Sequence, residues 1–91
     1  MWQVAKNASL HFHSWNDEFV VYNSASGDTH LLGMLAAQSV IRLQDAPSNI
    51  SDLLDTISQL LQIQPDDELK EMIEKTLIDL SCLGIVENIT H

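Results

Sequence analysis

The stretch EFVVYNSASGDTHLL, residues 18–32, decides the fold that we expect for this chain. Its first part, Phe19 to Asn23, is rich in β-branched and aromatic residues, which is typical of a strand. A turn with Ser, Gly and Asp follows, and a second short run, Thr29 to Leu32, leads directly into a helical pattern. Two strands joined by such a turn indicate a β-hairpin. We expect the second strand to keep an open outer edge, whose unpaired N–H and C=O groups can bind another chain.

A further strand is predicted on the amino-terminal side of this hairpin. Apolar and polar side chains alternate from Leu10 to Trp15, which is the period of a half-buried strand. Asn16 and Asp17 supply a short turn, so the three strands form an antiparallel meander. Because both faces of the run 19–23 are apolar, we predict that it is the central strand.

Two helices are predicted directly after the hairpin. The first begins at Met34 and ends before Pro47, which lacks an N–H and cannot continue a helix. Ser51 is predicted to be the N-cap of the second helix. The predicted buried stripe of the second helix consists of Leu53, Leu54, Ile57, Leu60 and Leu61.

A third, longer helix opens at Pro65 and stops at Gly84. Its first turn carries the acids 66–68, which the helix dipole favours there. Residues 85–89 are expected to form a short extended tail. The stripe of this helix recurs at spacings of three and four, at Leu69, Met72, Ile73, Thr76, Leu77, Leu80 and Leu83. The sequence therefore predicts one α+β domain, residues 1–91, in which a three-stranded antiparallel sheet is followed by three helices in a winged-helix-like layout.

Composition and charge restrict the function. The chain has 13 acidic and 4 basic residues and a net charge of −9, which repels nucleic acids and anionic membrane surfaces. No apolar segment approaches the roughly 20 residues that span a bilayer, and the N-terminus does not have the pattern of a signal peptide. The single cysteine, Cys82, cannot form an internal disulfide. These features lead us to expect a cytoplasmic protein.

No group of residues predicts catalysis or a cofactor. His11 and His13 share one strand face and, together with His30, could in principle hold a metal. The spacing is a weak motif, and we favour the interpretation that these are partly exposed strand histidines. Cys82 has no basic neighbour that would activate it as a nucleophile. We therefore predict a protein that is not an enzyme and has no catalytic residues, metal or cofactor.

Three segments, in their order along the chain, resemble a known family, the PqqD-type peptide chaperones, also called RiPP recognition elements. The segments are Val20-Val21-Tyr22-Asn23, then Ser26-Gly27-Asp28-Thr29-His30-Leu31-Leu32, then Ala36-Ala37 at the opening of a helix. The branch that accompanies an HPr-kinase-related protein is the most similar. The resemblance extends from Leu10 to Val86, and the helices match only in order, length and spacing.

This resemblance implies a non-catalytic peptide chaperone that binds the leader of a ribosomally made precursor peptide and presents it to a modifying enzyme. The peptide would add as a strand to the third strand, in a groove beside the third helix. The implied peptide-binding residues are Thr29, His30, Leu31 and Leu32 on the strand and Met72, Ile73, Thr76 and Asp79 on the helix. For Met72 and Ile73, packing in the core is an equally good interpretation. The acidic composition leads us to expect a neutral or basic guest.

Two other functions compete with peptide binding. A structural adaptor would dock on a partner enzyme, such as an HPr-kinase-related one, through Trp2, Trp15 or Ile78, without capturing a peptide. DNA binding is suggested by the winged-helix-like layout alone, but the third helix carries only Lys70 and Lys75 against six acids. The open strand edge is compatible with a monomer or with a weak homodimer.

Overall fold

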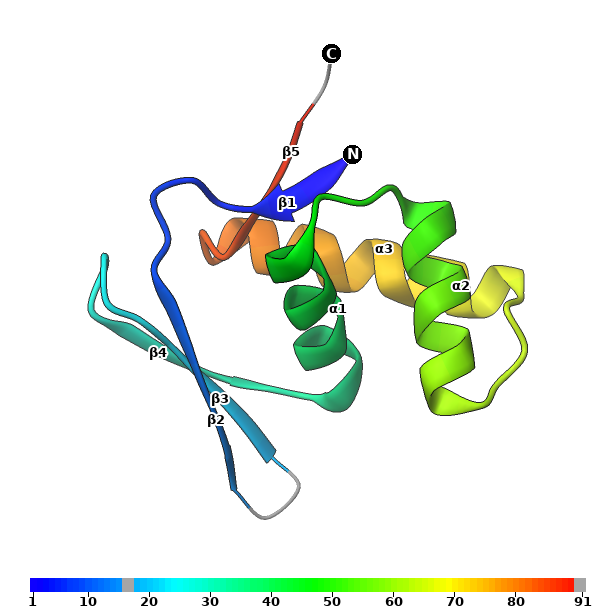
Figure 1. The fold of residues 1–91 in the computed structure, drawn as a ribbon, viewed down its shortest axis with the longest axis horizontal. Helices are drawn as coiled ribbons and strands as arrows, with labels where there is room; N and C mark the ends of the chain where they lie inside the picture. Colours follow the sequence, from blue (N-terminus) through cyan, green and yellow to red (C-terminus); the bar gives the residue numbers. More distant parts are fainter. Residues whose placement is uncertain (16–17, 90–91) are drawn as a thin grey trace.

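Two antiparallel sheets and three helices make up the computed structural model, which describes residues 1–15 and 18–89. The predicted turn at Asn16 and Asp17 lies outside the described residues. Figure 1 shows the larger sheet on one side of the molecule and the helices on the other, with β1 and β5 side by side. In chain order the elements are β1 (Trp2–Val4), β2 (Leu10–Trp15), β3 (Glu18–Asn23), β4 (Asp28–Leu32), α1 (Met34–Asp45), α2 (Ile50–Leu61), α3 (Asp67–Cys82) and β5 (Val86–Asn88).

The three-stranded sheet has the order β2-β3-β4 and is antiparallel throughout, which confirms the predicted meander and its central strand. In the register of the sheet, Val21 lies between Phe12 and His30. Val21 is fully buried and Leu32, on the same face, is nearly so, because this face packs against the helices. The opposite face is exposed and includes Tyr22 and Leu31.

The hairpin between β3 and β4 is fixed by Asn23 and Gly27. The buried side chain of Asn23 accepts hydrogen bonds from the backbone N–H groups of Ser9 and Ala25, both at 3.1 Å. The N–H of Gly27 donates to the carbonyl of Asn23 at 2.8 Å, and Gly27 has a φ of 81°, which favours glycine. These contacts explain why the turn lies at the Ser-Gly-Asp segment.

The second sheet pairs the two ends of the chain and was not predicted. Strands β1 and β5 are antiparallel, with Gln3 opposite Glu87, and Trp2 also exchanges backbone hydrogen bonds with Ser48. The residues expected as an extended tail are therefore the partner strand of an N-terminal strand. Trp2 is only 9% exposed and belongs to the hydrophobic core.

Helix α1 packs against both α2 and α3, and the core lies between these helices and the sheet. The side chains that solvent does not reach are Val21, Ala37, Ser39, Val40, Ile57, Ile73, Leu77 and Ile85. Three residues of the predicted stripes are instead about half exposed, Leu60 at 46%, Met72 at 52% and Leu83 at 46%. The buried stripe of α3 is accordingly narrower than predicted and consists of Leu69, Ile73, Leu77 and Leu80.

The caps of α2 and α3 also refine the predicted boundaries. The side chain of Asn49, not of Ser51, caps α2, because its Oδ1 accepts a hydrogen bond from the N–H of Asp52 at 2.8 Å. Asp66 caps α3 in the same way, through the N–H of Leu69 at 2.8 Å.

The cap of α2 can be tested by two substitutions. Asn49→Ala should lower the free energy of unfolding by about 1 kcal/mol, because the N–H of Asp52 then loses its side-chain partner. Ser51→Ala should change it by less than about 0.5 kcal/mol, because Ser51 is an exposed residue inside the helix. Urea unfolding followed by circular dichroism measures both, and equal losses would contradict the assigned cap.

Candidate functional site

The candidate site begins at the outer edge of β4. Among the described residues, β4 pairs only with β3, and the carboxyl-terminal strand β5 pairs with β1 instead of covering β4. In an antiparallel ladder, alternate residues of an edge strand direct their N–H and C=O groups outward. The predicted open edge is therefore present, and it offers backbone hydrogen bonds to an extended chain.

The four predicted residues of this strand divide between the two faces of the sheet. Thr29 and Leu31 lie on the exposed face, and Leu31 is 64% exposed. His30 is half-buried and Leu32 is buried, on the face that packs against α1. A chain added at this edge would therefore place successive side chains alternately on an open face and beside the helices.

The predicted residues of α3 also differ in exposure. Met72 is 52% exposed and Asp79 is exposed, whereas Thr76 is half-buried and its hydroxyl donates to the carbonyl of Met72 at 2.7 Å. Ile73 is fully buried, so its side chain belongs to the core and not to a groove wall. Core packing, which the sequence left open for both Met72 and Ile73, thus holds for Ile73 alone.

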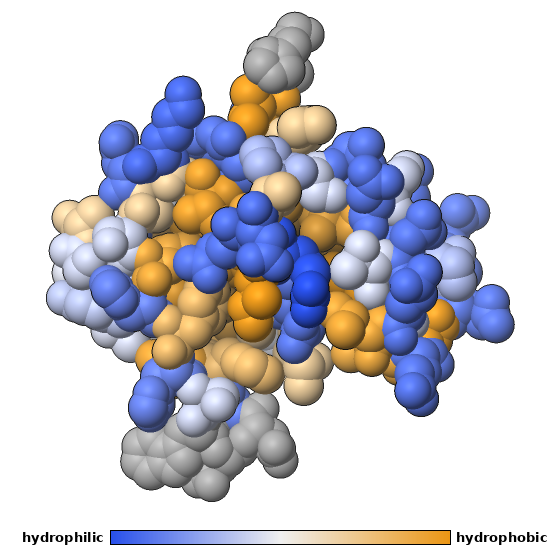
Figure 2. Space-filling model, in the orientation of Figure 1, coloured by the Kyte–Doolittle hydropathy of each residue, from blue (hydrophilic) through white to orange (hydrophobic). Residues whose placement is uncertain are grey.

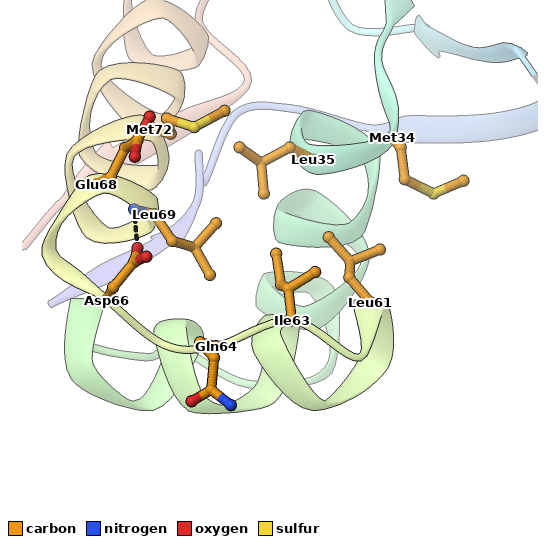
Figure 3. Close-up of a pocket in the computed structure, with 9 residues that line it drawn as sticks. All are labelled: Met34, Leu35, Leu61, Ile63, Gln64, Asp66, Glu68, Leu69 and Met72. Carbon is orange, nitrogen blue, oxygen red and sulfur yellow. Dashed lines mark hydrogen bonds between the residues drawn. The ribbon is translucent and has the colours of Figure 1, made fainter.

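An apolar hollow of about 350 Å³ lies where β4 leads into α1 (Figure 3). Met34 and Leu35 begin α1, directly after Gly33. In Figure 3 the side chains of Leu35, Ile63 and Leu69 point toward one another across the hollow. We call this cavity the end hollow. Its apolar lining residues are Met34, Leu35, Leu61, Ile63, Leu69 and Met72. Met72, one of the predicted wall residues of α3, therefore lines the same hollow as Met34, which lies two residues beyond the end of β4.

Acidic side chains border the end hollow on one side. Asp66 and Glu68, together with Gln64, complete its lining. One carboxylate oxygen of Asp66 is engaged as the cap of α3, and Figure 3 shows this hydrogen bond to Leu69. Glu68 is exposed, and Figure 3 shows its carboxylate beside Met72. The hollow thus combines an apolar floor with an anionic rim.

Sequence reasoning missed most of the end hollow. Met34, Leu35 and Leu61 were assigned to helices, and their meeting depends on how α1, α2 and α3 pack. One local signal was present: Ile63 is an apolar residue between two glutamines in a connecting segment, and it is 47% exposed. Figure 2 shows that apolar surface reaches the outside at several places between the polar side chains.

Other predicted groups do not come together. His11 and His13 lie on the exposed face of the sheet, whereas His30 lies on the opposite face, since side chains alternate along a strand. In the described ranges no three His, Cys, Asp or Glu residues are arranged to hold a metal ion.

The three residues suggested as docking contacts of an adaptor lie in different surroundings. Trp2 is buried in the core, so it is not a docking residue. Ile78 is 54% exposed, on the side of α3 away from the core stripe. The side chain of Trp15 lies outside the described part of the chain.

Comparison with known proteins identifies a common fold. No family model matches the sequence, and no curated protein is significantly similar to it. A solved structure, "TbiB1 in Complex with the TbiA(beta) Leader Peptide", superimposes with a TM-score of 0.73 and 12% sequence identity, over 98% of this chain and 99% of that chain. The chain therefore has the α+β fold of that protein over nearly its whole length. Within residues 1–15 and 18–89, no helix has the length and apolar character needed to cross a membrane.

The different positions of Ile73 and Met72 can be tested through stability. Ile73→Val should lower the free energy of unfolding by about 1 kcal/mol, because it removes a fully buried methylene group. Met72→Ala should lower the free energy of unfolding by less than about 0.5 kcal/mol, because half of that side chain is already exposed to solvent. Urea unfolding of both variants decides the matter, and a larger loss for Met72 would place it in the core.

Proposed function

We propose that this domain is a non-catalytic peptide chaperone of the RiPP recognition element type. It binds the leader of a ribosomally made precursor peptide as an added strand on β4 and presents the precursor to a modifying enzyme. The observation that carries this proposal is the open outer edge of β4, which no strand among residues 1–15 and 18–89 covers. The likeness to a structure described as a complex with a leader peptide supports it.

Strand addition fits the chemistry of this edge. Main-chain hydrogen bonds supply affinity for an extended peptide of almost any sequence, and side-chain pockets supply specificity. The guest would pair with the backbone of residues 29–32, and Met72, Thr76 and Asp79 would form the facing wall on α3. Ordering a flexible leader costs free energy, so binding of this kind is modest in affinity and reversible, as a hand-over to an enzyme requires.

The choice of β4 over β2 depends on the surroundings of the two edges. Among the described residues, β2 also pairs on one side only. The apolar end hollow, however, adjoins β4, because Met34 follows this strand after a single glycine. The edge of β4 can therefore combine backbone pairing with apolar side-chain contacts.

The remaining parts of the proposal concern partners and location. The proposed partner is the modifying enzyme or an HPr-kinase-related enzyme, and the proposed location is the cytoplasm. The net charge of −9 favours a neutral or basic guest. The proposed state is a monomer or a weak homodimer.

Titration of the ¹⁵N-labelled protein tests the binding site directly. The ligands are synthetic leader segments of the precursor peptides encoded beside this gene. We expect the amide signals of residues 29–32 and of the exposed side of α3 to shift, because new hydrogen bonds form along β4. Shifts confined to residues 10–15 would place the guest on β2 instead, and no shift with any such leader would contradict peptide binding.

Two matched substitutions on α3 test the wall. Met72→Ser should weaken binding of the same leader by about tenfold, because it removes an exposed apolar side chain from the proposed wall and from the end hollow. Ile78→Ser is the control, since Ile78 is equally exposed, at 54% against 52%, but lies on the far side of the helix. Isothermal titration calorimetry measures both, and equal effects would contradict the assigned wall.

A further inference from the structure

The end hollow offers a second kind of contact, and we infer that it recognises one bulky apolar side chain of the guest together with an adjacent Lys or Arg. This inference rests on the proposed function, because it assigns the hollow to the same peptide that pairs with β4. It adds a specificity determinant that backbone pairing cannot provide.

The size and lining of the hollow suit a side chain. About 350 Å³ is near the lower end of ligand pockets, which span about 300–1,000 Å³, so there is room for one or two side chains. The exposed apolar members of its lining are Met34 at 46%, Ile63 at 47% and Met72 at 52%. Covering this apolar surface with a Leu, Ile, Met or Phe side chain is favourable. Methionines adapt to side chains of different shape, so the hollow selects for bulk and not for one residue.

The position of the hollow identifies its occupant. Only Gly33 separates Leu32, the last residue of β4, from Met34, the first residue of the lining. A strand advances about 3.3 Å per residue. A guest paired along β4 therefore reaches the hollow within one or two residues beyond the paired segment.

The rim determines the charge of the neighbouring guest residue. Three carboxylates, those of residues 66–68, lie at the amino-terminal end of α3. The helix dipole contributes only about half a positive charge there, and Lys70 adds one more, so the rim stays anionic. Asp66 is partly occupied as a cap, which leaves the exposed Glu68 as the main partner for a cation. The aliphatic part of a Lys or Arg side chain can pack against the apolar lining of the hollow while its charged group lies near the carboxylates of the rim.

The test is a selection from a phage-displayed library of random dodecapeptides, carried out on the whole protein at low and at high salt. We expect enriched peptides to contain a β-prone stretch and, at one end of it, a bulky apolar residue next to Lys or Arg. The basic residue should be less enriched at high salt, because screening weakens its attraction to the rim. A synthetic copy of the most enriched peptide then serves as the probe for the variants.

Two pairs of variants separate the apolar and the charged contact. Ile63→Ser should weaken binding of the probe peptide by about fivefold, whereas Leu60→Ser should leave its affinity unchanged. Both side chains are about half exposed, but of the two only Ile63 lines the hollow. Glu68→Lys should weaken binding of the probe peptide by about fivefold, and a library selection on this variant should no longer enrich a basic residue. Asp55→Lys, on the exposed side of α2, makes the same change in net charge, from −9 to −7, as its control.

The outcomes separate this inference from the proposed function. Enriched peptides that shift the amides of residues 29–32 but lack the apolar–basic pair would contradict the inference and leave strand addition standing. The same holds if each variant and its control behave alike. If no peptide is enriched and no leader segment shifts these amides, both the inference and the proposed function are wrong.

Discussion

The pairing of β1 with β5 is the constraint on which the site depends. It joins residues that are more than eighty positions apart in the sequence, because the carboxyl-terminal strand β5 forms its hydrogen bonds with the N-terminal strand β1. Burial of Trp2 and Val86 in the core holds this small sheet against the helices. Because the tail is engaged there, the edge of β4 has no partner from the described part of the chain. The carboxyl-terminal strand β5 therefore pairs with β1 and does not cover this edge.

Helix α3 links the core to the candidate site through its two sides. Its buried stripe, from Leu69 to Leu80, is a main support of the core, while Met72 and Asp79 point to solvent. Since adjacent positions such as Met72 and Ile73 lie 100° apart on a helix, one can be a surface residue while the next is fully buried. The core stripe therefore fixes the orientation of the exposed side, so the proposed wall on α3 is positioned by packing and not by a loop.

Local patterns predicted most of the fold. Alternation from Leu10 to Trp15 and the Ser-Gly-Asp turn were sufficient to place the meander, and the apolar spacing placed the three helices. Strand β1 was missed because three residues are too short for a period, and its partner is distant in sequence. Ser51 was preferred over Asn49 because both residue types cap helices, and only the backbone geometry decides between them.

Only those parts of the candidate site that are formed by a single helix or strand could be predicted from the sequence. The open edge of β4 follows from strand order, which short connections determine, and the structure contains it. The residues predicted for a groove wall on α3 were chosen from the helical period, and an uncertainty of one position was enough to include the buried Ile73. The end hollow depends on three helices meeting, so only the exposed Ile63 hinted at it.

An open strand edge in a small domain invites self-association, since a second copy offers the same unpaired groups. The charge of this chain opposes that outcome. Two copies, each with a net charge of −9, repel one another. Asp66 and Glu68 also line the same hollow as Met34, which follows β4 after one glycine. A neutral or cationic peptide does not meet this repulsion. The same acidic surface that disfavours pairing between copies therefore leaves the edge available to the proposed guest, and net charge would then be a part of the specificity of the proposed site.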